Sequence, residues 1–300
     1  MNTGVLAAIG AFTLWGFLPL YLKLLDHAGA VEIMAHRIVW SLLFVVFLLS
    51  IRRQWRWLLT LRQSPKLIAI ACGCAVLLST NWLTYIWAVT SGHIIEASLG
   101  YFINPLLNVL LGMIFLGERL RRGQWLALTI ATAGVLYMTI AYGQPPWIAL
   151  ILAFSFGFYG LIRKRSPLGS VEGLTLETVV IVVPALAYLL YLSSQGQAQF
   201  GLGSWSDDLL FVGTGIATAL PLIWFAYGAQ RITLTQLGLL QYIGPSIQMV
   251  VAIVVFNESF SGPRVVGFGL IWLALALYSA EGIYNRRKTL KAAATSASHS

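Results

Sequence analysis

An internal repeat constrains the fold of this chain more than any other feature of its sequence. The segments Tyr101–Pro105 and Gln241–Pro245 lie 140 positions apart. Each opens an apolar stretch that ends in an acidic residue at the same offset, Glu118 or Glu258. Repetition at this distance indicates two copies of one structural unit. A unit with an odd number of membrane-spanning helices inserts its second copy upside down, as in many secondary transporters.

The composition is that of a membrane protein. Hydrophobic residues make up 58% of the chain, charged residues make up 10%, and the mean hydropathy is +0.81. Because the bilayer core offers no water to backbone N–H and C=O groups, apolar stretches of about 20 residues predict spanning helices. We predict an all-α integral membrane protein with ten such helices, at residues 3–25, 32–51, 66–90, 94–117, 123–142, 146–163, 173–193, 207–230, 234–256 and 263–284.

Five of the predicted helices fall in each half of the chain. We therefore predict two inverted five-helix repeats, at residues 1–142 and 143–285, followed by a cytoplasmic tail at 286–300. The last residues of this tail, 292–300, are mostly small and polar, which is typical of a disordered terminus.

The basic residues predict the orientation, because positively charged short loops stay on the cytoplasmic side. If both termini are cytoplasmic, all but three of the 19 Lys and Arg residues lie in cytoplasmic loops or in the tail, and the exceptions are Lys23, Arg37 and Arg264. The outward loops carry none. The net charge of +9 therefore reflects membrane topology and does not indicate a nucleic-acid partner.

The chain lacks the sequence patterns of metal, nucleotide and catalytic sites. It contains no H-E-x-x-H, no G-x-x-x-x-G-K and no G-x-S-x-G. Cys72 and Cys74 lie two residues apart on a predicted helix, so their side chains project about 200° apart and do not meet. We expect no metal ion, no cofactor and no enzymatic activity. The expected partners are the lipid bilayer and a small-molecule substrate.

Polar and aromatic residues inside the predicted helices indicate a central cavity. Such side chains are costly against lipid, so they face the bundle interior or water. They are densest on the third and fourth helices of each half, where residues four apart, such as Asn104 and Asn108, share one helical face. The predicted cavity residues are His36, Arg37, Trp40, Asn81, Tyr85, Glu96, Tyr101, Asn104, Asn108, Tyr227, Gln241 and Tyr242.

His36 and Arg37 form an unusual ionisable pair early in the second helix. One interpretation is a polar anchor or a proton-sensitive latch at the outer mouth of the cavity, because histidine titrates near neutral pH. The alternative is structural: Arg37 extends to the interface or pairs with Glu32 or Glu96. The groups available for proton coupling are His36, Glu96 and Glu177, and facilitated exchange without a coupling ion is the other interpretation.

Pro105 and Pro245 occupy the same place in the two repeats. Proline lacks the N–H that would bond the carbonyl four residues earlier, so the carbonyls of Tyr101 and Gln241 are released. An unpaired carbonyl is costly in lipid, so these sites should face protein or a cavity. They act as hinges or as packing kinks, and their recurrence favours the hinge.

Glu118 and Glu258 end the fourth helix of each repeat. The helix macrodipole disfavours an anion at this end, so each carboxylate needs a local partner. Arg119, Arg121 and Arg122 follow Glu118, and Arg264 follows Glu258. We predict that the two glutamates close gates or link helices on opposite faces of the membrane.

These segments resemble the EamA domains of the drug/metabolite transporter superfamily, and within it the RarD family, named for chloramphenicol sensitivity. The resemblance covers Met1 to about Asn285 and is strongest in Ala35–Ser41, Asn81–Leu83, Glu96–Leu106, Gly112–Arg119 and Gln241–Pro245. It implies a permease of the bacterial inner membrane that exports or exchanges small organic molecules, such as chloramphenicol-like or aromatic compounds, by alternating access. The two repeats would rock around a central site.

Two other functions are compatible with the sequence. A membrane-embedded enzyme acting on a lipid-linked substrate is favoured if Arg37, Glu96 and Glu177 converge on one site. A scaffold without transport activity would have no aqueous path between its helices. The arrangement of these three side chains and the presence of a cavity therefore distinguish the alternatives.

Overall fold

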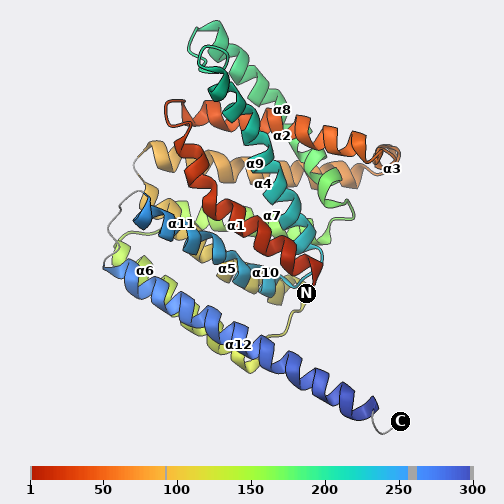
Figure 1. Cartoon of the computed structure of the whole chain (residues 1–300), viewed down its shortest axis with the longest axis vertical. Coiled ribbons are helices and arrows are strands. Elements are labelled where there is room, and N and C mark those ends of the chain that lie inside the picture. The colour runs from red at the N-terminus through yellow and green to blue at the C-terminus, as the bar shows by residue number, and fades with distance from the viewer. Residues whose placement is uncertain (1, 92, 256–261, 298–300) are drawn as a thin grey trace.

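The computed structural model describes residues 2–91, 93–255 and 262–297, and the regular structure within these ranges is entirely helical. The helices are α1 (Thr3–Lys23), α2 (Ala30–Ile51), α3 (Trp57–Gln63), α4 (Pro65–Thr90), α5 (Ile94–Leu116), α6 (Arg122–Tyr142), α7 (Trp147–Arg165), α8 (Ser170–Ser194), α9 (Trp205–Ala229), α10 (Leu234–Gln241), α11 (Ile243–Val254) and α12 (Pro263–Ala297) (Figure 1).

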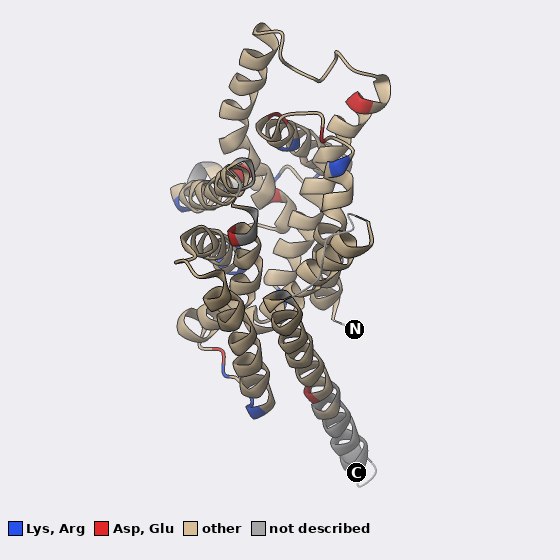
Figure 2. Ribbon diagram, turned by 90° about the vertical axis from the view of Figure 1, so that its left-hand side faces the viewer, with Lys and Arg blue, Asp and Glu red and all other residues tan. Residues whose placement is uncertain are grey.

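The prediction of ten spanning helices is confirmed. Ten helical segments are long and apolar enough to cross a bilayer, and each overlaps one predicted span. The short helix α3 precedes the third span, and α10 and α11 together form the ninth, Leu234–Val254. Long stretches of these helices carry no charged residue (Figure 2), as the low dielectric of a bilayer requires.

Helix α12 is longer than its membrane span. It continues through Ala297, into the segment 286–300 that was predicted as a cytoplasmic tail with a disordered end at 292–300. The residues after Asn285 include several strong helix formers, Arg, Lys, Leu and Ala, and neither Gly nor Pro interrupts them before Ala297. Local helix propensity therefore extends the last spanning helix beyond its apolar part.

The two halves of the chain build one common body. Helix α1 packs against α9 and α11, and α2 packs against α8 and α9. Helix α5 lies between α7 and α10, while α6 and α12 pair along one edge of the molecule (Figure 1). The largest hydrophobic core combines first-half residues such as Phe12 and Leu78 with second-half residues such as Phe225 and Leu237.

The ninth span is interrupted at Tyr242, between α10 and α11. Pro245 explains the position of this break, because it has no N–H to donate to the carbonyl of Gln241. The equivalent Pro105 lies inside α5, which continues as one helix from Ile94 to Leu116. The same proline is thus accompanied by a break in one repeat and by a continuous helix in the other.

Helices α5 and α10 approach closely at Gly238. A Cβ atom at this position would lie 2.6 Å from the backbone oxygen of Pro105 and 3.0 Å from Cβ of Asn108. Glycine is therefore required by the packing, because any side chain would push the two helices apart.

We expect Gly238→Ala to destabilise the fold by about 1–3 kcal/mol through overpacking. Thermal unfolding of the purified protein in detergent measures this effect. Gly73→Ala is the matched control, because a Cβ at Gly73 in α4 meets no atom within 4 Å. A Gly238→Ala variant as stable as the Gly73→Ala variant would contradict the close approach.

Candidate functional site

A cavity lies between helices of both halves of the chain. Its volume is about 140 Å³, which is enough for a small solute. Its walls come from α1, α2, α4 and α5 in the first half and from α7, α9, α10 and α11 in the second. The lining residues are Phe12, Trp15, Leu18, Pro19, Leu22, Arg37, Asn81, Trp82, Tyr85, Gly100, Tyr101, Asn104, Leu152, Phe156, Thr218, Leu222, Gln241, Gly244, Pro245 and Gln248.

Arg37 on α2 is the charged residue of this cavity, since the lining residues that the structure describes include no other Lys or Arg and no Asp or Glu. Its Nε donates a hydrogen bond of 2.8 Å to Oγ1 of Thr218 on α9. Its guanidinium carbon lies 5.5 Å from the ring centroid of Trp82, within the range of a cation–π interaction. Arg37 therefore joins α2 to both α4 and α9 from inside the cavity.

Aromatic rings form much of the remaining wall. Trp15 on α1 meets Phe156 on α7 edge to face, with ring centroids 5.6 Å apart. Tyr85 on α4 and Tyr101 on α5 also meet edge to face, at 6.1 Å. Such rings offer large apolar surfaces with defined orientation, which suits a flat or amphiphilic solute.

Side-chain amides connect the cavity wall to the neighbouring helices. Asn104 donates to the carbonyl of Ala153 at 3.1 Å and accepts from Nδ2 of Asn108 at 3.0 Å. Nδ2 of Asn108 also donates to Oε1 of Gln241 at 2.8 Å, so the network spans α5, α7 and α10. Asn108 is fully buried and its Oδ1 has no partner among the described residues. A buried acceptor without a donor costs about 1–3 kcal/mol.

Half of the predicted cavity residues line this cavity. These are Arg37, Asn81, Tyr85, Tyr101, Asn104 and Gln241. Asn108 lies immediately behind them through its bonds to Asn104 and Gln241. Pro245, predicted as a hinge, also lines the cavity, whereas Pro105 packs against Gly238 of α10.

His36 and Trp40 lie outside the cavity lining, contrary to the prediction. Nδ1 of His36 accepts a hydrogen bond of 3.2 Å from Nε1 of Trp40, and the imidazole packs 4.7 Å from the ring of Phe211. Successive residues on a helix project about 100° apart, so His36 faces α9 where its neighbour Arg37 faces the cavity.

Three more predicted residues lie outside the lining: Glu96, Tyr227 and Tyr242. The carboxylate of Glu96 accepts from the backbone N–H of Ile148, at 2.7 Å, at the start of α7. The hydroxyl of Tyr242 donates to the carbonyl of Phe102 at 3.2 Å. The ring of Tyr227 lies beneath the guanidinium of Arg231, 3.4 Å from its carbon atom.

Glu118 links the two halves, but not through its arginine neighbours. Its carboxylate accepts from the backbone N–H groups of Leu234 and Thr235, at 2.7 and 2.9 Å, and from Oγ1 of Thr235 at 2.8 Å. The positive N-terminal end of α10 thus satisfies the anion that the C-terminal end of α5 disfavours. Glu258 lies outside the described residues, so its gating role stays a prediction.

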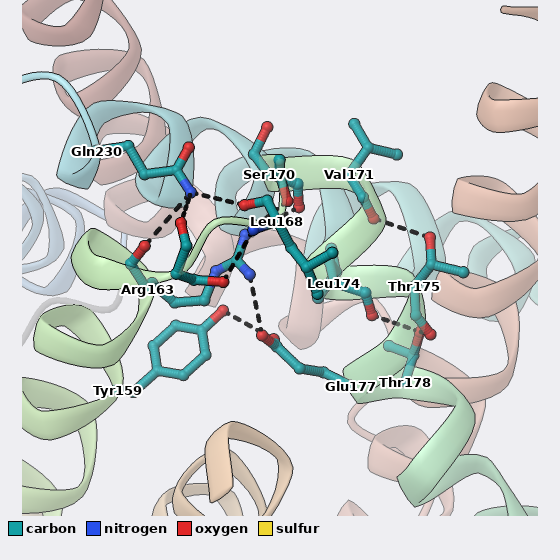
Figure 3. A network of polar contacts seen from close by, with 12 residues as sticks. Tyr159, Arg163, Leu168, Ser170, Val171, Leu174, Thr175, Glu177, Thr178 and Gln230 are labelled. Atoms are coloured by element: carbon teal, nitrogen blue, oxygen red, sulfur yellow. Dashed lines mark hydrogen bonds and ion pairs between the residues drawn. The ribbon is translucent and has the colours of Figure 1, made fainter. Parts of the chain in front are cut away.

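Glu177 belongs to a separate buried network (Figure 3). Its carboxylate lies 3.4 Å from Nη1 of Arg163 and accepts from the hydroxyl of Tyr159 at 3.2 Å. Arg163 also donates to the carbonyl of Gly169 at 3.0 Å, and Nε2 of Gln230 donates to the carbonyl of Leu168 at 2.8 Å. The network ties α7 to α8 and α9, and none of its members lines the cavity. In the described part of the chain, no three His, Cys, Asp or Glu side chains gather as metal ligands.

Sequence reasoning missed most of the apolar cavity wall. Trp15, Leu18, Phe156 and Leu222 are residues that any packed membrane helix could carry, so the sequence holds no signal that separates cavity lining from core packing. Thr218, by contrast, is a polar residue in the middle of a spanning helix, and that signal could have placed it in the site.

The EamA-like transporter family matches this chain twice, over residues 2–140 and 146–280. The chain is 45% identical to protein RarD of Escherichia coli strain K12 over 288 residues, which cover 96% of this chain and 97% of that protein. It is 46% identical over 281 residues to the uncharacterized transporter YojE of Bacillus subtilis strain 168, covering 92% of this chain and 93% of YojE. A solved crystal structure with 22% sequence identity shares the fold, with a TM-score of 0.70 over 92% of this chain and 97% of that one. This multi-pass membrane protein belongs to the EamA-like transporter family.

Proposed function

We propose that this protein is a secondary transporter of the bacterial inner membrane that moves small organic molecules by alternating access. The observation that carries the proposal is a cavity with a guanidinium, amide groups and aromatic rings, lined by helices of both halves. A site shared by two halves changes its access when one half moves relative to the other.

The position of the cavity along the helices supports a one-sided, outward-facing state. Its lining lies in the second half of α1, the first half of α5 and the start of α11. At the opposite end of α5, Glu118 caps α10, and between this contact and the cavity Gly238 packs against Pro105. If both termini are cytoplasmic, as the basic residues indicate, the closed end faces the cytoplasm.

We infer that the two halves are inverted repeats. Each half matches the family and contains five candidate spans, and an odd number of spans reverses the orientation of the second copy. Rocking would separate α5 from α10 at the cytoplasmic end while the outer ends of the helices approach. The break at Tyr242 beside Pro245 provides a hinge within the moving span.

We infer that transport is driven by the substrate's own gradient or by exchange. The three groups considered for proton coupling are His36, Glu96 and Glu177, and none of them lines the cavity. Glu96 caps α7 and Glu177 pairs with Arg163, so protonation of either would act first on fold contacts.

The two alternative functions have less support. Arg37 contacts Thr218, Glu96 contacts the N–H of Ile148 and Glu177 contacts Arg163, so the three do not form the single site that an enzyme would require. A scaffold would not require a cavity between its halves, and an arginine inside such a cavity would be an unnecessary cost in stability.

The proposal is tested by uptake and efflux in proteoliposomes. The labelled panel includes chloramphenicol and aromatic amino acids, with and without an imposed pH gradient. We expect counterflow of at least one compound that is independent of the pH gradient. Gradient-dependent flux would contradict the inferred energy source, and the absence of flux for every compound would contradict transport.

A pair of variants on α1 tests whether the cavity is the path. Leu18→Trp places an indole in the lining, and we expect its flux to fall to the level of empty vesicles. Leu14→Trp is the matched control, because Leu14 is an exposed residue on the same helix outside the lining. Equal flux in the two variants would show that solutes do not pass through this cavity.

A further inference from the structure

We propose that the cavity selects organic monoanions with an aromatic body, and that the Arg37 guanidinium binds their carboxylate. This inference rests on the proposed function, since it names the class of molecule that the same cavity receives. The cavity would distinguish such anions from neutral compounds and from zwitterionic amino acids that contain the same aromatic ring.

The charge of Arg37 in the cavity is not balanced by an ion pair within the described chain. Arg37 lies within a span of α2, yet it forms no ion pair with any described carboxylate. The two glutamates that could have paired with it are engaged elsewhere: Glu32 accepts from the N–H of Gln199 at 2.7 Å, and Glu96 accepts from the N–H of Ile148. A cation held in a low-dielectric site without an anion is costly, and a bound anion would remove that cost.

The guanidinium of Arg37 has nitrogen atoms available for a substrate carboxylate. Its Nε is used by Thr218, while Nη1 and Nη2 have no hydrogen-bond partner in the described part of the chain. Neither Nη atom is among the fully buried polar atoms that lack a hydrogen-bond partner, which is consistent with both atoms facing the open cavity. Two adjacent N–H groups of an arginine form the fork that binds a carboxylate with two parallel bonds.

Three amides of the lining are engaged in contacts with the cavity wall. Nδ2 of Asn81 donates to the carbonyl of Leu152 at 2.9 Å and to Oγ of Ser155 at 3.0 Å. Nδ2 of Asn104 donates to the carbonyl of Ala153, and Nε2 of Gln248 donates to the carbonyl of Trp15 at 3.0 Å. These amides hold the wall in place, and the charged donor among the described lining residues is Arg37.

The cavity disfavours solutes that carry an ammonium group. The described lining residues include no carboxylate that could bind a substrate ammonium group, and Arg37 repels such a group. The ammonium group of an amine or a zwitterionic amino acid would therefore enter the cavity without an anionic partner. A monoanion has no ammonium group and does not carry this cost. The rings of Trp82, Tyr85 and Tyr101 beside Arg37 suit the aromatic body.

The test compares four probes with one phenyl ring and different charges. They are phenylacetate, 2-phenylacetamide, phenethylamine and phenylalanine, which are anionic, neutral, cationic and zwitterionic. Their binding to the purified full-length protein is measured by isothermal titration calorimetry and by the shift of the thermal unfolding temperature. For the native protein we expect phenylacetate to bind at least about tenfold more tightly than the other three, equivalent to about 1.4 kcal/mol. Binding of the amide or of phenylalanine as tight as that of phenylacetate would overturn the proposal.

Variants then assign the preference to Arg37. Arg37→Gln should bind phenylacetate and 2-phenylacetamide equally, and Arg231→Gln, which removes an exposed cation at a helix end, should keep the native preference. A preference for phenylacetate that survives in Arg37→Gln would overturn the assignment. If Arg37→Gln does not fold, Thr218→Val, which removes the partner of Nε, should weaken phenylacetate binding more than 2-phenylacetamide binding. The opposite order would count against the proposal.

Binding and transport are measured separately so that the two proposals fail separately. Phenylacetate binding without flux in proteoliposomes, after passive diffusion into empty vesicles is subtracted, would support the anion site and contradict the transporter. Flux of neutral compounds with equal binding of all four probes would support the transporter and contradict the anion site.

Discussion

Glu177→Gln is expected to destabilise the folded protein by about 3–5 kcal/mol, because it removes one partner of a buried ion pair and leaves the other charge uncompensated. The side chains of Arg163 and Glu177 are each 1% exposed, and Nε of Arg163 already lacks a partner among the described residues. The neutral amide would leave the guanidinium buried beside Tyr159 without a counter-charge. Thermal unfolding of the purified protein, followed by loss of helical circular dichroism, measures the change.

A double variant separates the effect of the ion pair from that of the packing around it. Arg163→Met combined with Glu177→Leu should be less destabilised than Glu177→Gln alone, because neither charge then remains buried. Glu172→Gln is the matched control, since Glu172 is a half-buried carboxylate on the same helix and the ion pair of Arg163 is with Glu177. If Glu177→Gln were as stable as the native protein, the negative charge of Glu177 would not be needed to compensate the buried charge of Arg163.

Glu118→Ala should have the second large effect, on both stability and access to the cavity. The substitution deprives two backbone N–H groups and the hydroxyl of Thr235 of their acceptor. Hydrogen bonds to a charged group contribute about 1.5–3 kcal/mol, so we expect a loss of about this size. Because the contact joins α5 to α10, its removal should also populate conformations in which this end of the bundle is open.

Thiol labelling measures that opening. A Leu237→Cys reporter on α10, in a chain whose Cys72 and Cys74 are replaced by alanine, starts fully buried. A membrane-impermeant thiol reagent applied from the cytoplasmic side should label it faster when Glu118→Ala is added. Glu118→Gln retains one acceptor oxygen and should give an intermediate rate. Equal rates in all three backgrounds would exclude a sealing role for Glu118.

The spanning helices could be predicted from the sequence because each is a local property. The prediction of 173–193, for example, lies inside α8, Ser170–Ser194, and differs only at the ends, where polar residues continue the helix. The split of the ninth span at Tyr242 was foreseeable in kind, since Pro245 removes a backbone donor. Pro105 leaves α5 continuous, and this difference from Pro245 could not be predicted from the proline alone.

The candidate site was predicted only where a residue type was out of place in lipid. Arg37, Asn81 and Gln241 stand out because polar side chains are costly in a membrane. His36 stands out equally, yet its one-residue displacement from Arg37 turns it towards Phe211. The partner of Glu118 lies at Thr235, 117 positions away, so a search among its neighbours could not find it.

The end of α7 has a consequence for the biosynthesis of the protein. Lys164 donates to the carbonyls of Ala229, at 3.1 Å, and Ile232, beyond the C-terminal end of α9, and Arg165 donates to the carbonyl of Phe115 near the end of α5. Cations are favourable at these negative helix ends. On the proposed orientation, the same two residues first retain a nascent loop on the cytoplasmic side and later hold the ends of helices from both halves. A neutral substitution here would therefore alter insertion and folding together, whereas exchanging lysine for arginine preserves the insertion signal and isolates the folding step.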